Sequence, residues 1–133
     1  MERSLSEVLV QGWDITGTGN GFLITTDWQL PNSERIEIYA RRVGDREDLY
    51  VVGDGGELFN LLFANGIDLS KDEQGMKIIL RIAENYAAQI VDFQLVKGAK
   101  EEELAQAVRM ILEAVKDASF LLWHKLDPKG SLH

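Results

Sequence analysis

The fold class follows from two stretches, Arg35-Ile-Glu-Ile-Tyr-Ala40 and Asp48-Leu-Tyr-Val-Val-Gly53, which a turn around Gly44 connects. Apolar and polar residues alternate in the first stretch, which is the period-2 pattern of a strand with one buried face. The second stretch is rich in valine and aromatic residues, which favour strands. Two such stretches on either side of a short polar turn predict an antiparallel hairpin.

Towards the N-terminus, Phe22 to Thr26 predicts a further strand, because β-branched and aromatic residues dominate it. The alternating glycines of Gly17-Thr18-Gly19-Asn20-Gly21 predict a flexible surface loop, since glycine and asparagine tolerate positive φ. This loop does not have the strand-to-helix context of a dinucleotide-binding fingerprint. At the start of the chain, Ser4-x-x-Glu7 is a capping-box pattern and predicts a short helix that ends at Gly12.

Towards the C-terminus, the spacing of apolar residues predicts three longer helices. The first follows Asp54-Gly55-Gly56-Glu57 and ends at Asn65-Gly66, and the second begins with the capping-box pattern Ser70-x-x-Glu73. Residues 89–97 predict one or two short strands, in which Phe93 and Leu95 share a face. The last helix is expected from Lys100 to about Lys125.

The predicted order of elements is therefore α-β-β-β-α-α-β-β-α. Because strands come in hairpins, we expect an α+β fold with a small, mainly antiparallel sheet. A chain of 133 residues is the size of one domain, so residues 1–133 are predicted to form a single domain.

These stretches also resemble a known family. Over about residues 20–125, the chain is similar to domain-of-unknown-function family 1828, which occurs in bacteria and their mobile elements. The resemblance rests on Phe22 to Thr26, Arg35 to Tyr39, Leu49 to Gly56 and the helix that follows. Two positions differ: Asp27 stands where the family often has proline, and Gly53 where it usually has threonine. The resemblance implies a shared sheet-turn-helix core and no particular activity.

Composition excludes several kinds of site. The chain has no cysteine and only two histidines, so we expect no disulfide, no thiolate chemistry, no histidine-based metal site, no catalytic triad and no cofactor. No apolar run approaches the length of a membrane helix, and no signal pattern opens the chain, which favours a cytoplasmic location. With 14 Lys and Arg against 22 Asp and Glu, the net charge is -8, and direct binding to nucleic acid is not expected.

The corner between strand and helix has two interpretations. Backbone N–H groups at Gly55 and Gly56 can hold an anion at a helix N-terminus, while Asp54 and Glu57 can hold a metal ion or move a proton. Alternatively, Asp54 caps the helix, Glu57 reaches back to it, and the two glycines only permit a sharp turn. Both interpretations remain open at the level of sequence.

A tryptophan in a loop either fills the core or anchors an interface, so several large apolar residues are candidates for contacts with a partner. The candidates are two tryptophans in predicted loops and a group near the end of the last helix: Trp13, Trp28, Phe120, Leu121 and Trp123. The apolar stripe of that helix is wide enough to predict a homodimer, unless the two preceding helices cover it within one chain.

Three functions follow as hypotheses. The first is a small protein–protein interaction or regulatory module that is not an enzyme and whose partner protein is unknown. The second is an acidic inhibitor that imitates nucleic acid, as a phage or mobile element uses against a host defence; it requires carboxylates gathered on one face. The third is a metal-dependent hydrolase centred on Asp54.

Overall fold

The structure, a computed structural model, describes residues 13–46 and 48–126 and the side chains up to Leu121. The predicted helix between Ser4 and Gly12 lies outside the described residues. The elements follow in the order β1 (Asp14–Thr18), β2 (Gly21–Gln29), β3 (Arg35–Arg42), β4 (Leu49–Gly53), α2 (Glu57–Ala64), α3 (Glu73–Asn85), β5 (Gln89–Val91), β6 (Gln94–Lys100), the 3-10 turn η1 (Glu101–Glu103) and α4 (Leu104–Leu126).

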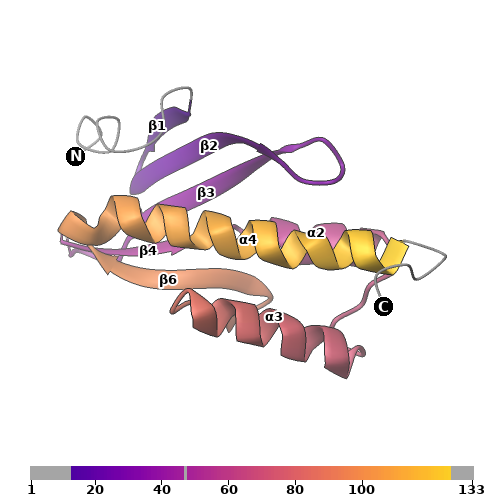
Figure 1. Cartoon of the computed structure of the whole chain (residues 1–133). Coiled ribbons are helices and arrows are strands. Elements are labelled where there is room, and N and C mark those ends of the chain that lie inside the picture. The colour runs from indigo at the N-terminus through magenta and orange to yellow at the C-terminus, as the bar shows by residue number, and fades with distance from the viewer. Residues whose placement is uncertain (1–12, 47, 127–133) are drawn as a thin grey trace.

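The strands form a six-stranded sheet in the order β1-β2-β3-β4-β6-β5, and every neighbouring pair is antiparallel (Figure 1). The β3–β4 hairpin is confirmed, with Ala40 opposite Val52. The α+β class is confirmed as well, and from β2 to α4 the order of strands and helices is the predicted one. The β4–β6 pairing brings together strands that are separated in sequence by two helices.

The glycine-rich segment before β2 differs from its prediction as a flexible loop. Asp14 to Thr18 forms an edge strand on β2, and the turn is confined to Gly19 and Asn20. Backbone pairing with a long neighbouring strand outweighs the low strand propensity of glycine, and Ile15 lies opposite Ile24. Gly21 is required for close approach, because an added Cβ would overlap the carbonyl oxygen of Ala40.

The start of α3 also differs from its prediction. The helix begins at Glu73, and its N-cap is Asp72, whose Oδ1 accepts a hydrogen bond of 2.9 Å from the Gly75 N–H. Ser70 lies in the preceding turn and donates to Asp68 instead. The capping-box assignment to Ser70 is wrong because an aspartate closer to the helix occupies the capping position.

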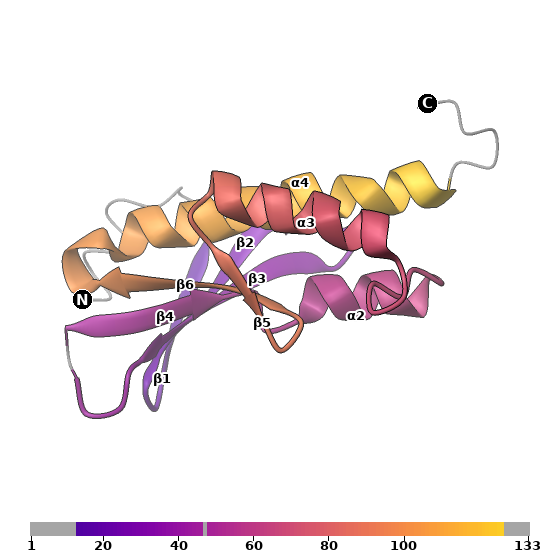
Figure 2. The ribbon, with the colours of Figure 1, turned by 90° about the horizontal axis from the view of Figure 1, so that it is seen from below.

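The two faces of the sheet have different surroundings. Helix α4 crosses one face and packs against β3, β4 and β6, with α3 beside it (Figures 1 and 2). Side chains of alternate strand residues fill this layer, among them Ile24, Ile38, Val52 and Leu95, which are fully buried. No helix of residues 13–46 and 48–126 covers the other face, which we call the open face (Figure 2).

Helix α4 is covered within the chain over the part whose side chains are described. It contacts α2 and α3 as well as the sheet. Five residues of its predicted stripe are buried: Leu104, Val108, Ile111, Leu112 and Val115. The sheet, α2 and α3 together bury this described part of the stripe, whereas Phe120 beside it remains exposed. The homodimer stays a prediction. Among the described helices, none has the length and apolar character needed to span a membrane.

Candidate functional site

The corner between β4 and α2 is built around one buried carboxylate. Asp54 is only 2% exposed. Its Oδ1 accepts hydrogen bonds from the N–H groups of Gly56 (3.0 Å) and Leu95 (3.1 Å), and its Oδ2 accepts one from Leu58 (3.3 Å). A single side chain therefore connects the sheet strand β6, the sharp turn and the first turn of α2.

These contacts support the structural interpretation of the corner. The N–H groups that an anion would use at Gly56 and Leu58 already face the Asp54 carboxylate. Burial raises the pKa of Asp54, although its three backbone donors act in the opposite direction. Across residues 13–46 and 48–126, no three His, Cys, Asp or Glu side chains gather where a metal ion would bind.

The details of the cap differ from the predicted pattern. The N-cap residue of α2 is Gly56, with φ of 82°, and Asp54 stabilises the helix from two residues further back. Glu57 is partly exposed. Its partial burial is the main cause that raises its pKa, and the negative charges of Glu37, Glu34 and Asp54 raise it further. Gly55, at φ of 68°, permits the sharp turn between strand and helix.

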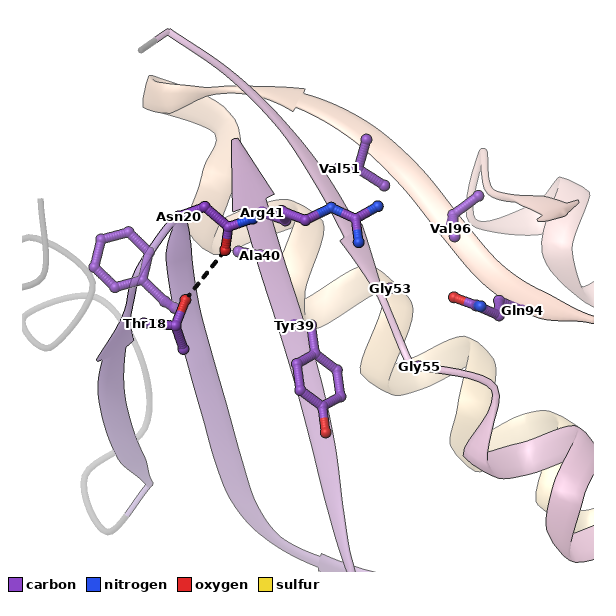
Figure 3. A pocket seen from close by; sticks show the side chains of 11 residues that line it. Thr18, Asn20, Tyr39, Ala40, Arg41, Val51, Gly53, Gly55, Gln94 and Val96 are labelled. Carbon is purple, nitrogen blue, oxygen red and sulfur yellow. Dashed lines mark hydrogen bonds between the residues drawn. The ribbon is translucent and has the colours of Figure 1, made fainter. Parts of the chain in front are cut away.

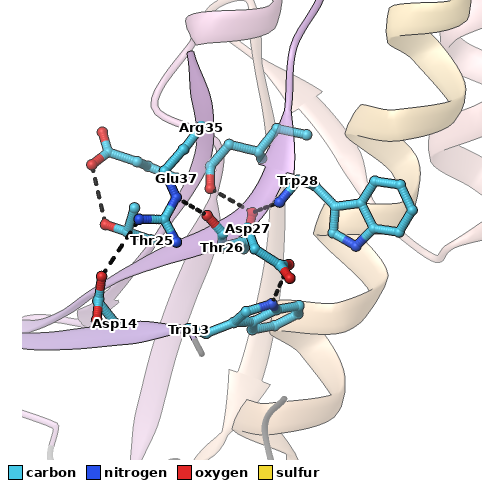
Figure 4. A network of polar contacts seen from close by, with 9 residues as sticks. Trp13, Asp14, Thr25, Thr26, Asp27, Trp28, Arg35 and Glu37 are labelled. Carbon is cyan, nitrogen blue, oxygen red and sulfur yellow. Dashed lines mark hydrogen bonds and ion pairs between the residues drawn. The ribbon is translucent and has the colours of Figure 1, made fainter. Parts of the chain in front are cut away.

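A second feature is a β-bulge in β2, where the register against β3 shifts between Thr25 and Gln29. Figure 4 shows the polar contacts of the residues around it. Thr26 is fully buried, and its Oγ1 donates to the Ile36 carbonyl (2.9 Å) while accepting from the Trp28 N–H (3.2 Å). The hydroxyl thus replaces ladder hydrogen bonds that the bulge interrupts.

The bulge positions the two tryptophans predicted in loops. Trp13 packs against the core, and its Nε1 donates to Asp27 Oδ1 at 2.8 Å. Trp28 lies in β2 rather than in a loop, and the Nζ of Lys116 on α4 stands 3.5 Å from its ring centroid. This cation–π contact connects the sheet to α4 and leaves about half of the Trp28 side chain exposed.

The two candidate side chains near the end of α4 that the structure describes differ in their exposure to solvent. Phe120 is 61% exposed, whereas Leu121 is buried within the chain. Leu121 is therefore a core residue in this protein, and Phe120 alone of the two faces solvent. The Trp123 side chain lies outside the described part.

The most exposed phenylalanine was not among the sequence candidates. Phe63 on α2 is 67% exposed, and Phe93 at the β5–β6 turn is 50% exposed. Both line a groove of about 360 Å³ together with Phe59, whose ring meets that of Phe93 edge to face at a centroid distance of 5.7 Å. We call Phe59, Phe63 and Phe93 the phenylalanine patch.

Phe93 occupies an unfavourable backbone conformation. It forms the two-residue turn between β5 and β6 with Asp92, and both residues have positive φ, 51° for Asp92 and 59° for Phe93. Such turns favour asparagine and glycine, because a Cβ and a bulky ring are strained there. The turn thus presents an aromatic side chain to solvent where folding alone would favour a small residue.

We compared the sequence with known protein families, curated proteins and solved structures. A family model described as domain of unknown function DUF1828 matches residues 26–116. The chain belongs to this family. Neither the search of curated proteins nor the search of solved structures gave a match.

The range matched by DUF1828 begins at the bulge residue Thr26 and includes the Asp54 corner and the whole phenylalanine patch. Trp13 and Phe120 lie outside that range. The DUF1828 core therefore contains the strained turn at Phe93 and the groove beside it, but only one of the two tryptophans whose side chains the structure describes, Trp28.

Within the part of the chain that the structure describes, carboxylates lie on both sides of the sheet rather than on one. Asp14 and Glu37 lie on the open face by register, and Glu113 and Asp117 lie on α4 on the opposite side. Others occupy turns and helix ends: Asp45, Asp48, Asp68, Asp92 and Glu101 to Glu103. This distribution provides no support for imitation of nucleic acid, which requires a one-sided acidic surface.

Proposed function

We propose that this DUF1828 chain is a non-enzymatic protein–protein interaction module that binds its partner through the phenylalanine patch. The observation that carries the proposal is the groove that the exposed rings of Phe63 and Phe93 line together with the buried ring of Phe59. Aromatic residues around a groove are typical anchors of protein interfaces.

Burial of the patch contributes favourable free energy to binding. Complete burial of one phenylalanine side chain is worth roughly 1.5–3 kcal/mol. Leaving two such rings in water has no benefit for folding, and Phe93 also has positive φ. A partner that covers both rings recovers this energy.

The charges at the groove indicate the chemistry of the partner. Asp68 lines the groove, and hydrogen bonding from Ser70 lowers its pKa, so it is ionised at neutral pH. Asp92 is exposed next to Phe93. We therefore expect a partner segment with one large apolar side chain flanked by lysine or arginine.

The test is affinity capture from native host cells with the whole tagged chain, followed by titration with the purified partner. Phe63→Ser and Phe93→Asn should each weaken binding by more than about tenfold, as expected for interface anchors. Phe120→Ser is the matched control, because it removes an equally exposed phenylalanine elsewhere and should change affinity by less than about twofold.

Thermal melting separates binding from folding. Asparagine tolerates the backbone conformation of residue 93 better than phenylalanine, which offsets the lost contact with Phe59, so Phe93→Asn should change the melting temperature little while it weakens binding. The proposal is overturned if the wild-type chain captures no partner, or if the two patch variants capture the same partner as strongly as wild type.

A further inference from the structure

The open face of the sheet contains a groove of about 510 Å³, separate from the phenylalanine patch (Figure 3). The two grooves have no lining residue in common. This volume is within the range of about 300–1,000 Å³ that small-molecule sites occupy. Strands β3, β4 and β6 form its floor, and residues of the β1–β2 turn lie at one end.

Two glycines create the depth of this groove. A Cβ on Gly53 would lie 2.9 Å from the Leu95 carbonyl oxygen, and a Cβ on Gly55 would lie 2.8 Å from Cε2 of Tyr39. The Tyr39 ring therefore lies against the backbone of the corner. Apolar side chains of Val51 and Val96 complete the floor.

Arg41 contributes the only charge among the residues that line the groove. Figure 3 shows its guanidinium extending over the groove towards Val51. Its cross-strand neighbours are Gly21 and Val51, neither of which is charged. Within the described part of the chain no ion pair includes Arg41, whereas Arg35 pairs with Asp14 and Arg46 with Asp48.

The position of the acidic residues orients a ligand in the groove. Glu37 and Glu57 lie near Tyr39. Burial of the Tyr39 hydroxyl raises its pKa, and the negative charges of the two glutamates raise it further. Glu37 is four residues from Arg41 along β3, or about 13 Å, so an anion is attracted to the Arg41 end and repelled from the Tyr39 end. An uncharged part fits beside Tyr39, about 7 Å from Arg41.

We propose that the open-face groove binds a small organic anion, whose carboxylate or phosphate group pairs with Arg41 and whose single apolar ring lies over Val51 and Val96 beside Tyr39. Guanidinium groups bind both kinds of anion in a bidentate manner. The groove is also lined by three polar residues, Thr18, Asn20 and Gln94. Their side chains would select the substituents of the bound ring.

The test is an amide NMR titration of the whole chain with four matched probes. Phenylacetate and phenyl phosphate carry the two anionic groups, and benzylamine and 2-phenylethanol replace the anion by a cation or a hydroxyl. We expect saturable shifts at Gly53, Gly55 and Val96 with at least one anion, and none with the other two probes. The stronger of the two anions identifies the source of the ligand as a carboxylate or a phosphate ester.

Two arginine variants provide the specific control. Arg41→Gln should weaken binding of the stronger anion by about tenfold, because one charge-assisted bidentate contact is lost. Arg42→Gln removes the same charge from the next residue, whose side chain is on the opposite face of β3, and should change affinity by less than about twofold.

The proposal is overturned if neither anion shifts the groove amides, if benzylamine shifts them equally, or if both arginine variants have the same effect. Arg41 is exposed, so loss of binding through unfolding is not expected, and the melting temperature of the variant verifies this. Failure of this test leaves the phenylalanine patch unaffected, because the two sites are lined by different residues.

Discussion

The two faces of the sheet are made from the same strands and serve different purposes. On β3, Ile36, Ile38 and Ala40 point towards α4 and are buried, whereas Tyr39 and Arg41 point to the open face and are exposed. The covered face accounts for stability through apolar packing. The open face holds an arginine without a partner in the described chain and a tyrosine against a glycine backbone, features that packing alone does not require.

The largest effect on the free energy of unfolding is expected from a comparison of two neighbouring residues, one on each face of the sheet. Ile38→Ala should lower the free energy of unfolding by about 2–5 kcal/mol, because it leaves a cavity at a fully buried position. Tyr39→Ala, its matched control on the open face, should cost less than about 1 kcal/mol. Urea denaturation measures both. Equal losses would mean that the open face also contributes to the core.

The Asp54 corner should have the next largest effect. Asp54→Ala removes the acceptor for three backbone N–H groups at a buried position, so we expect a loss of about 2–4 kcal/mol in the free energy of unfolding. Glu57→Ala, on the same corner, should cost less than about 1 kcal/mol. Chemical denaturation distinguishes them, and a small effect of Asp54→Ala would contradict the role of its carboxylate as a structural connection.

A smaller loss of stability is expected at Gly55, which lies in the β4–α2 corner beside the open face. Gly55→Ala should cost about 1–3 kcal/mol, through positive φ and contact with the Tyr39 ring. Gly66→Ala is the control, since Gly66 also has positive φ but no atom near the added Cβ. Thermal denaturation of both variants gives the contribution of the Tyr39 contact as their difference. No difference would mean that the ring moves aside freely.

The smallest effect concerns a contact on the helical layer. Tyr86 donates to Asp117 Oδ2 at 2.7 Å, and this bond raises the pKa of Tyr86 to about 12. Tyr86→Phe should lower the free energy of unfolding by about 1 kcal/mol or less at neutral pH. Because the folded pKa is raised, this stabilisation is present below about pH 10 and is lost as the pH rises towards 12.

Denaturation at a series of pH values measures the difference between wild type and Tyr86→Phe. The difference should be constant up to about pH 10 and shrink above it. A difference that grows at alkaline pH would contradict the assigned direction of the pKa shift.

Much of the fold was predictable because its signals are local. Alternation in residues 35–40 required only that one face of β3 be buried, and the helix period of α4 identified Val108 and Ile111 as core residues. The edge strand β1 was missed, since Thr-Gly repeats have low strand propensity and depend on the backbone of β2 for pairing. Phe93 was placed on the face of Leu95, because alternation carries no information about the turn that Phe93 itself forms with Asp92.

The candidate sites depended far more on tertiary structure. Composition and spacing were enough to predict the α+β class, the lack of cysteine chemistry and the importance of the Asp54 corner, and the resemblance to the family identified the shared core. Tertiary structure decided that Leu121 is buried, that Phe63 and Phe93 lie beside one groove, and that Arg41 lies over another with no charged cross-strand neighbour. The reason is that burial and charge pairing depend on which elements meet, and the β4–β6 pairing joins residues more than 40 positions apart.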